Sequence, residues 1–448
     1  MSMSIPMLGA IIFIGTIAGI MYLIGLTKKW GILLPFAGMV FFSSLAMPLS
    51  WNDQVNPTVW LPIQRIRSSL FFGSGIAATL IVLFQLQRLK GKSISISAIM
   101  LIGVGLYASF LRYVHGGAED GTFSVVFSVM TLFPLAMTAA MILDEVSDLR
   151  LIFRSIALTN IIWIGMVFVQ IAVNPNYVTQ GNEYRFVGLL SNPQHSGVLM
   201  AFFVVISLWL LLNDQKKYKI IMIGLTGVNG LFLLWTGSRT GLGMTLIGVS
   251  SVLYSRAGRA ILLLPLAGIL GFLSLKIMVN VVGIDLGFER MVSTENTRSA
   301  AWQELIMSAS QNPLIGVGMD EIDRSENSWL YGYATYGIGM LLLLVITTIA
   351  AGIEILKAVR ARFIMQPEYR PYLDIVLGIL LMYLAGAVLE GYMISRVSMT
   401  TSMFMIASVG LLNIRKAAVH QIEYASMYDE YQSEYGDEYA DDYEEGYS

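Results

Sequence analysis

The 448-residue chain has no cysteine, only three histidines and few charged residues, which make up 13% of the sequence. Without cysteine there is no thiolate chemistry, no zinc–thiolate site and no disulfide. Three histidines leave little room for an imidazole-rich metal site, so we expect neither a metal nor another cofactor. Soluble domains carry about one quarter charged residues. The shortage of charge, together with 56% hydrophobic residues, excludes an ordinary soluble protein.

Apolar runs of about 20 residues, the length that crosses a bilayer, recur along the whole chain. Thirteen spans are predicted, at 7–26, 31–49, 68–86, 94–111, 123–142, 152–173, 195–212, 220–236, 240–254, 260–277, 335–356, 372–393 and 397–413. Continuous rather than alternating hydrophobicity excludes an outer-membrane barrel. Hydrocarbon requires each segment to satisfy its own backbone polar groups. We therefore predict an all-α polytopic membrane bundle of about 12–14 transmembrane helices. The first run lacks a basic leader and a cleavage site, so it is expected to be retained.

The distribution of basic residues predicts the orientation, because cytoplasmic loops are enriched in Lys and Arg. With Lys28 and Lys29 inside, every second connection carries basic residues, and 18 of the 28 fall on the cytoplasmic side. This places the N-terminus in the periplasm and the C-terminus in the cytoplasm of a bacterial inner membrane.

Arginine departs from this pattern. Nine of ten lysines fall inside, Lys276 being the exception, whereas the arginines divide evenly between the two sides. Topology alone should deplete both residue types outside. The surplus favours a role in binding phosphate, which the planar guanidinium contacts in a bidentate manner. The alternative for each outer arginine is that it forms an ion pair with a nearby carboxylate or with a lipid headgroup. The outer arginines are Arg65, Arg67, Arg112, Arg185, Arg239, Arg290, Arg298, Arg324 and Arg396.

The longest outer connection, about 278–334, carries several arginines and carboxylates. Its middle, 296–310, predicts a short helix, which Asn312-Pro313 would end before a turn at Gly316-Val-Gly318. An interfacial apolar face with an aromatic anchor is expected on this helix. Long loops with structure of their own are often functional, although a solvated loop is the alternative. The residues of the predicted face are Trp302, Leu305, Ile306 and Ala309.

Two shorter outer connections also carry charge. The connection 174–196 contains Arg185 and His195, and a tight hairpin over 235–241 contains Arg239. A charge so close to hydrocarbon usually faces a cavity and carries function; an arginine that snorkels to the headgroups is the alternative. His195 either accepts a proton or neighbours the preceding Asn-Pro turn, and the turn role is favoured.

The last segment is acidic and rich in tyrosine. Ten of the 30 carboxylates follow Lys416, with no further basic residue, and without them the net charge moves from −2 to +8. This composition is too acidic and too poor in aliphatic residues to pack. We predict a transmembrane domain over 1–416 and a disordered cytoplasmic tail over 417–448. The alternative is a docking site regulated by tyrosine phosphorylation.

Motifs in the outer connections together suggest a family. In chain order they are Arg185-x-x-Gly188, Asn192-Pro193, Thr236-Gly-Ser-Arg239-Thr-Gly, Arg298-x-x-x-Trp302, Asn312-Pro-Leu-x-Gly316-x-Gly318, Glu326-Asn327-Ser-Trp-Leu330 and Gly337-Ile-x-Gly339. Over about 180–345 the chain thereby resembles the superfamily of O-antigen ligases and polymerases. The resemblance implies glycosyl transfer at the periplasmic face from an oligosaccharide on undecaprenyl pyrophosphate, without metal or nucleotide.

The resemblance also implies roles for individual residues. Arg185, Arg239 and Arg298 would hold the pyrophosphate, and Trp302 and His195 complete the expected substrate-binding set.

The ligases carry histidine before the asparagine of the Glu326-Asn327 motif. A carboxylate can also take the acceptor proton if its pKa is tuned by a partly buried site. Glu326 is therefore expected to be the base, with Asn327 orienting it or the sugar.

This departure favours a polymerase over an O-antigen ligase or a protein O-oligosaccharyltransferase. A flippase and a chain-length regulator are the expected partners, besides membrane lipid; no nucleic acid is expected. A polyisoprenoid-glycan or anion transporter is the rival from another class. Transporters place ionisable residues near the membrane midplane, whereas Glu390 and Lys276 lie near predicted span ends.

Overall fold

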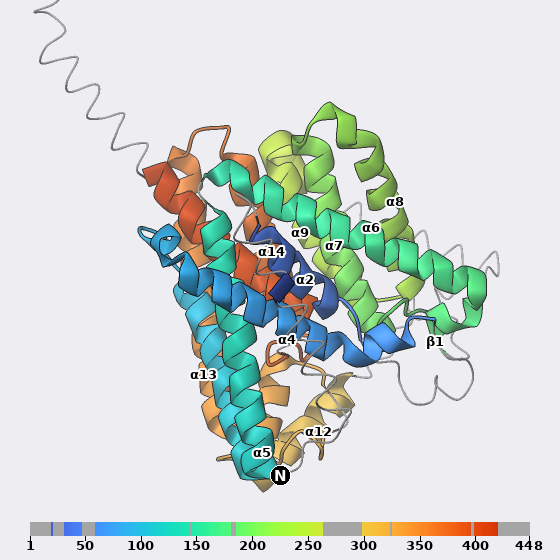
Figure 1. The fold of residues 1–448 in the computed structure, drawn as a ribbon, viewed down its shortest axis with the longest axis vertical. Helices are drawn as coiled ribbons and strands as arrows, with labels where there is room; N and C mark the ends of the chain where they lie inside the picture. Colours follow the sequence, from blue (N-terminus) through green and yellow to red (C-terminus); the bar gives the residue numbers. More distant parts are fainter. Residues whose placement is uncertain are drawn as a thin grey trace, which may run out of the picture.

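The computed structural model describes residues 19–20, 31–46, 59–143, 145–180, 185–262, 298–322, 325–395 and 398–419. Over these residues the chain is helical apart from one two-residue antiparallel ladder, so the predicted all-α class is confirmed for this part (Figure 1). The helices are α2 (Leu33–Ser43), α4 (Leu61–Phe84), α5 (Ile96–Ile142), α6 (Leu149–Val173), α7 (Pro193–Asn213), α8 (Lys219–Thr236), α9 (Arg239–Ala257), α12 (Arg298–Gln311), α13 (Ser328–Ile364), α14 (Arg370–Ala387) and Met399–Val419. The short turns are η1 (Leu86–Leu89), η2 (Val146–Asp148), η3 (Pro175–Val178), η5 (Lys216–Tyr218) and η6 (Gly258–Leu262), and the strands are β1 (Thr179–Gln180) and β2 (Arg185–Phe186).

Eight helices of the described part are long and apolar enough to cross a membrane, as expected of a multi-pass membrane protein. They are α4, α5, α6 with η2, α7, α8 with η5, α13, α14 and Met399–Val419. Because α5 contains two predicted spans, the eight helices account for nine of the thirteen. The helix α9 corresponds to a tenth predicted span, 240–254, but is less apolar than the eight. The helix α2 covers only 11 residues of the predicted span 31–49.

Several predictions fall outside the described residues. These are most of spans 7–26 and 260–277, residues 278–297 of the long connection, Arg324, Arg396 and the tail beyond Val419.

The helix α5 is a hairpin of two antiparallel arms (Figure 1). The chain reverses at Gly117, whose φ of 83° is left-handed. Ser109 Oγ lies 2.8 Å from Ser128 Oγ and donates to the carbonyl of Ser124 at 3.0 Å, which joins the arms. Small side chains at such a contact let two membrane helices approach closely and hydrogen-bond.

A second break lies in α13, at Gly337, whose φ is 76°. The break leaves the carbonyls of Ala334 and Thr335 without helical partners. The N–H groups of Val317 and Gly318 donate to these carbonyls, at 2.9 and 3.1 Å. The turn itself lies at 313–315, just before the predicted position, and 316–318 is an irregular segment with left-handed φ at Gly316 and Gly318 that satisfies the backbone of the broken helix. Because α13 begins at Ser328, the long connection ends earlier than residue 334.

Replacing Gly337 with alanine is expected to lower the melting temperature of the purified protein. The left-handed φ costs a non-glycine residue about 1–3 kcal/mol, and the new Cβ would lie 2.1 Å from the carbonyl oxygen of Leu314. Gly352→Ala in the same helix is the control, since a Cβ there meets no atom within 4 Å. Equal melting temperatures for the two variants in detergent would contradict the close backbone approach.

The predicted short helix at 296–310 corresponds to α12, but its apolar face differs from the prediction. Ala301, Leu305 and Ala309 are buried, and Leu305 and Ala309 cluster with Ala334 of α13, whereas Ile306 is 53% exposed. The predicted interfacial face is wrong in this respect, because the helix packs on α13 along its i, i+4, i+8 stripe.

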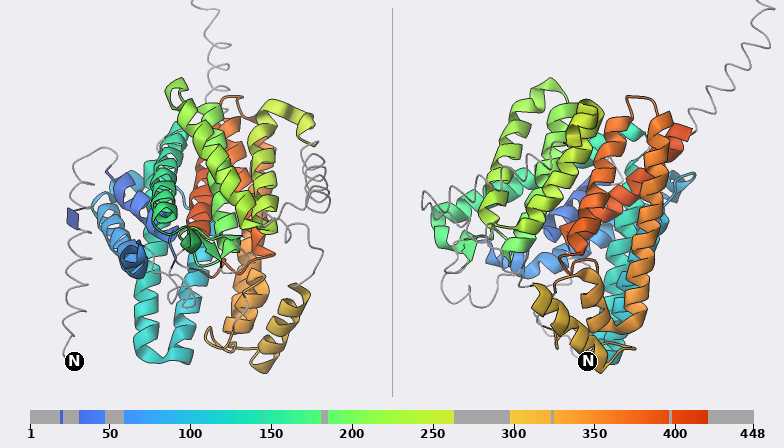
Figure 2. Two further views of the ribbon diagram at one scale, coloured as in Figure 1. Left: turned by 90° about the vertical axis from the view of Figure 1, so that its right-hand side faces the viewer. Right: turned by 180° about the vertical axis from the view of Figure 1, so that it is seen from behind.

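The remaining helices form the body of the molecule, in which α7 packs against both α8 and α9, and α9 packs against α14 (Figure 2). Glycine allows the close crossing: a Cβ at Gly248 of α9 would lie 2.3 Å from Met382 Sδ and 2.6 Å from Val205 Cγ2. The helix α9 is therefore packed between α7 and α14.

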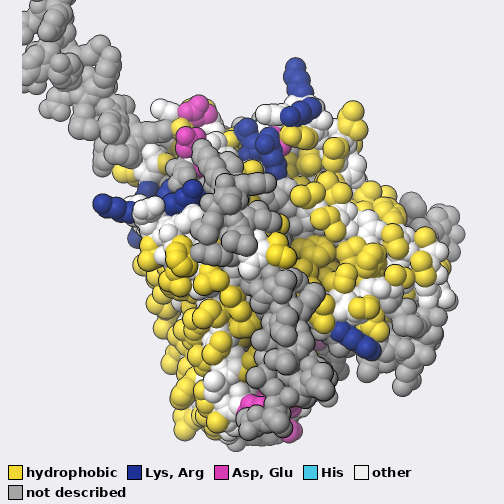
Figure 3. Space-filling view, viewed as in Figure 1, with side chains coloured by type: hydrophobic (Ala, Val, Ile, Leu, Met, Phe, Trp, Pro, Cys, Tyr) yellow, Lys and Arg dark blue, Asp and Glu magenta, His cyan; other side chains and the backbone are white. Residues whose placement is uncertain are grey.

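Most of the Lys and Arg side chains visible in Figure 3 lie in the upper part of the view, above a broad hydrophobic surface, while one lies at the lower right and Asp and Glu side chains also appear at the bottom. Two ion pairs join helix ends predicted to be cytoplasmic: Arg154 with Asp214, and Arg362 with Asp374 at 2.7 Å. Burial opposes the charge of Asp214, but the hydrogen bonds from Arg154 and from the Gln215 N–H outweigh it and lower the pKa of Asp214. The predicted cytoplasmic helix ends thus pair with one another in the fold.

Candidate functional site

The turn between α8 and α9 is the centre of the candidate site. Gly237, with a φ of 60°, ends α8, and Ser238 caps α9 by accepting the Gly241 N–H at 3.1 Å. Thr236 Oγ1 accepts the Ser238 N–H at 3.1 Å. The predicted tight hairpin is confirmed, and it presents Arg239, an exposed residue, as the first residue of α9.

The three arginines predicted to hold pyrophosphate meet at this turn. Arg185, which is 4% exposed, donates from Nε to the carbonyl of Thr236 at 2.8 Å. Arg298 donates from Nη2 to Thr240 Oγ1 at 3.0 Å. Arg239 lies between these two threonines in the chain. Arginines from three separate connections therefore lie around one five-residue turn.

A buried carboxylate holds Arg298 in place. Glu390 is 4% exposed, and its Oε1 lies 3.0 Å from Arg298 Nη2 and accepts from Thr240 Oγ1 at 3.0 Å. Arg298 also donates to the carbonyl of Leu389. Burial raises the pKa of the Glu390 carboxyl, and the attraction of Arg298 and the bond from Thr240 do not cancel this rise. Such a carboxyl exchanges a proton closer to neutral pH than an exposed glutamate does.

Sequence reasoning missed Glu390, which lies 92 positions from Arg298. The signal was present, because an ionisable residue inside a predicted span, here 372–393, usually marks a functional site.

The N-termini of α9 and α13, together with Arg298 of α12, converge on Glu390. Thr240 in the first turn of α9 and Arg298, the first residue of α12, contact the Glu390 side chain. Ser328, the first residue of α13, donates from Oγ to the Glu390 carbonyl at 2.6 Å. Because the N-terminus of a helix carries partial positive charge, the starts of α9 and α13, together with the arginines, make this region suited to an anionic ligand.

Glu326 and Asn327 lie next to this region. Asn327, with a φ of 69°, caps α13: its Oδ1 accepts the N–H groups of Trp329 and Leu330, both at 3.1 Å. The cap positions the half-buried Glu326, whose charge is close enough to Glu390 to add to the rise of the Glu390 pKa. Glu326 Oε2 is buried and has no hydrogen-bond partner among the described residues.

A cavity of about 330 Å³ adjoins the two carboxylates, since Ser325 and Gly391 both line it. Arg67 and His195 also line its wall, and Arg67 Nε is buried without a hydrogen-bond partner within the described ranges. His195 is exposed to this space. Asn192, and not His195, provides the side-chain cap at the start of α7. The His195 ring lines the cavity. Arg67 was recognised in the sequence only as an outer arginine, because nothing in α4 indicates a cavity.

Trp302 lies one turn after Arg298 on α12. It is half-buried, and its Nε1 is a buried donor that finds no acceptor in the part of the chain that the structure describes. The same described residues contain no group of three or more His, Asp or Glu side chains that could hold a metal ion. The site is thus built from arginine, carboxylate, amide and hydroxyl groups.

Comparison of the chain with protein-family models and with curated proteins finds no match.

Replacing Glu390 with glutamine is expected to weaken the fold around α12. The change removes a carboxylate that Arg298 contacts. Breaking a fully buried pair costs about 3–5 kcal/mol, and less is expected here because the Arg298 side chain is 23% exposed. Denaturant titration of the purified protein in mixed micelles measures the loss. Glu321→Gln, at an exposed position in the segment that follows α12, is the control. An unfolding free energy equal to that of the control would show that Glu390 does not hold α12.

Proposed function

We propose that this protein polymerises oligosaccharide repeat units carried on undecaprenyl pyrophosphate, at the periplasmic face of a bacterial inner membrane. One observation carries the proposal: Arg185, Arg239 and Arg298, selected from three separate connections, converge on the α8–α9 turn beside two carboxylates. The resemblance of the motifs to O-antigen polymerases supports the same reaction.

The chemistry requires stabilisation of a leaving pyrophosphate. The bond between the anomeric carbon and the pyrophosphate oxygen breaks, a glycosidic bond forms to the acceptor hydroxyl, and the hydroxyl proton passes to a carboxylate. Negative charge grows on the leaving oxygen, and fixed cations in a site with little water stabilise it strongly. Arg239 is exposed for direct contact, while Arg298 is oriented by Glu390 and Thr240.

The two carboxylates, Glu326 and Glu390, have different roles. Glu326 accepts the proton of the acceptor hydroxyl, because its buried Oε2 has no hydrogen-bond partner among the described residues. Glu390 is occupied by Arg298 and Thr240, so it positions the cation. Asn327, as the cap of α13, keeps Glu326 in place.

The adjoining cavity receives the acceptor glycan. Its volume of about 330 Å³ falls at the small end of ligand sites. Tyr331, Tyr392 and several Ser and Thr residues line it with Arg67 and His195, a mixture that suits the apolar faces and hydroxyls of sugars. A second lipid-linked glycan is the acceptor of the polymerase reaction.

Reconstitution with purified lipid-linked repeat unit tests the proposal. Products that differ by whole repeat units, formed without added nucleotide, are expected on a gel. Transfer to lipid A core or to protein, with no polymer, would instead identify a ligase or a protein oligosaccharyltransferase. Movement of intact substrate across the bilayer with no new glycosidic bond would identify a transporter and overturn the proposal.

A further inference from the structure

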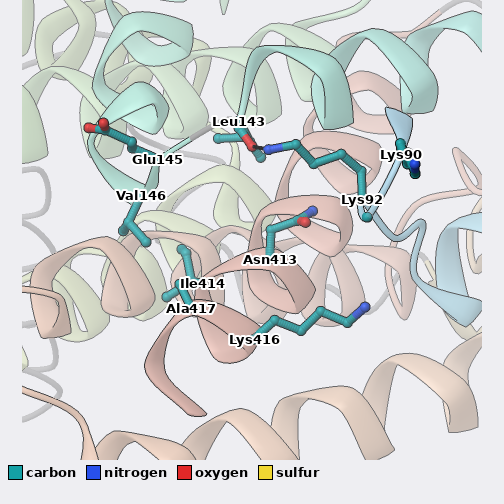
Figure 4. Close-up of a pocket in the computed structure, with 10 residues that line it drawn as sticks. Lys90, Lys92, Leu143, Glu145, Val146, Asn413, Ile414, Lys416 and Ala417 are labelled. Atoms are coloured by element: carbon teal, nitrogen blue, oxygen red, sulfur yellow. Dashed lines mark hydrogen bonds between the residues drawn. The ribbon is translucent and has the colours of Figure 1, made fainter. Parts of the chain in front are cut away.

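A second cavity, of about 440 Å³, lies at the other end of the bundle (Figure 4). The helix Met399–Val419 shows the separation: Met399 and Thr400 line the first cavity, and Ala417 lines the second. Even the nearest lining residues on this helix, Thr400 and Asn413, are 13 residues apart, which is about 20 Å of helix, so this cavity takes no part in the proposed transfer site. It is lined by Lys90, Gly91, Lys92, Leu143, Glu145, Val146, Asn413, Ile414, Lys416 and Ala417.

The cavity is basic. Three lysines line it against the single carboxylate of Glu145. Lys92 Nζ donates to the carbonyl of Leu143, the residue that follows α5, and Lys416 Nζ donates to Ser93 Oγ. Lys90 and Lys416 are exposed. Hydrogen bonds therefore hold the ammonium groups of Lys92 and Lys416 in position, and Lys90 contributes a third, exposed ammonium group to the lining.

Part of the opposite wall of the cavity is apolar. Val146, Ile414 and Ala417 lie together on one side in Figure 4, with Glu145 above Val146, and the lysine side chains extend on the other side. A ligand that fills both parts must carry negative charge together with an apolar or aromatic group.

The end of this chain has that composition. Residues 420–448 contain ten carboxylates, seven tyrosines and no Lys or Arg. The segment begins directly after Val419, three residues beyond Lys416 of the cavity. A short tether raises the effective concentration of a bound segment to about the millimolar range, so even weak contacts are populated.

We propose that this basic cavity is the docking site of the acidic, tyrosine-rich C-terminal segment of the same chain. Carboxylates bind Lys90 and Lys416, and a tyrosine ring packs on Val146, Ile414 and Ala417. The inference is independent of the proposed transferase activity, since it uses neither the arginines nor the carboxylates of that site.

Zero-length carbodiimide cross-linking of the full-length protein in phosphatidylcholine nanodiscs, read by mass spectrometry, tests the docking. Cross-links within one chain are expected from Lys90 and Lys416 to carboxylates of 423–445. Their yield falls several-fold at 1 M salt, where the Debye length is only about 3 Å. The single variant Lys90→Gln is expected to lower the yield at Lys416, a residue it leaves unchanged.

Lys216→Gln is the matched control, because this exposed lysine lies on η5, away from the cavity. It should leave the Lys416 cross-links unchanged, and the melting temperatures of both variants verify that they fold. The proposal is overturned by cross-links spread evenly over Lys216, Lys217 and Lys416, by cross-links found only between two copies, or by none. Loss of the cross-links in nanodiscs that contain phosphatidylglycerol would assign the cavity to lipid phosphate instead, and would equally overturn it.

Discussion

Replacing Glu326 with glutamine is expected to remove nearly all transfer while the protein still folds and enters the membrane. Glutamine keeps the shape of the side chain but cannot accept the proton of the acceptor hydroxyl. General-base catalysis contributes about 10²–10⁴-fold to a rate, so a loss of this size is predicted. The initial rate of polymer formation from purified lipid-linked repeat unit measures it.

Glu321→Gln is the matched control, because Glu321 is an exposed carboxylate five residues away. It should retain the parental rate. Full activity in Glu326→Gln would remove that residue from the mechanism. If Glu326→Gln were active and a folded Glu390→Gln inactive, the base would be Glu390.

Arg298→Lys is expected to lower the rate of transfer by about 10²-fold, although the positive charge is kept. Loss of one donor that stabilises the developing charge costs about this much. The guanidinium of Arg298 contacts Thr240 Oγ1, Glu390 Oε1 and the Leu389 carbonyl at once. A lysine presents one ammonium group on a flexible stem and cannot reproduce the planar fork.

The matched control is Arg65→Lys, since Arg65 is exposed on α4 and lies outside the candidate site. Transfer kinetics at saturating donor compare the two variants, with the melting temperature as a check on folding. A parental rate in Arg298→Lys would show that only the charge at this position matters, not its geometry.

Much of the fold was predictable, because apolar segments of membrane-spanning length must form helices. Segments such as α7 and α8 are continuous apolar runs, and a helix is the structure that satisfies their backbone in hydrocarbon. The α8–α9 turn was also predictable, because Gly237 and Ser238 are typical residues of a helix C-terminus and a following N-cap.

The α12 face was predicted wrongly because the pattern of one helix does not specify its partner. The large side chain of Ile306 suggested an apolar contact, but Leu305 and Ala309 are the residues of α12 that pack against Ala334 of α13. The start of α13 was placed too late because its first turns contain Tyr, Trp and Gly, which lower the hydropathy.

The candidate site was predictable in part. Arginines, unlike lysines, were predicted on both sides of the membrane, which drew attention to the outer ones. The fold brings three of these to one turn. The pairing of Arg298 with Glu390 was not predictable, because it joins positions 92 residues apart, although Glu390 could have been noticed as an ionisable residue inside a predicted span. The cavity beside Arg67 and His195 arises only when α4, α7 and the segment after α14 pack together.

The most direct measurement is the number of undecaprenyl pyrophosphate molecules released for each glycosidic bond formed. Both products are counted by mass spectrometry in proteoliposomes that contain the purified protein, lipid-linked repeat unit and no nucleotide. The account predicts one lipid pyrophosphate per new bond, with release abolished in Glu326→Gln. Substrate that moves across the bilayer with its pyrophosphate linkage intact and no released lipid would contradict it.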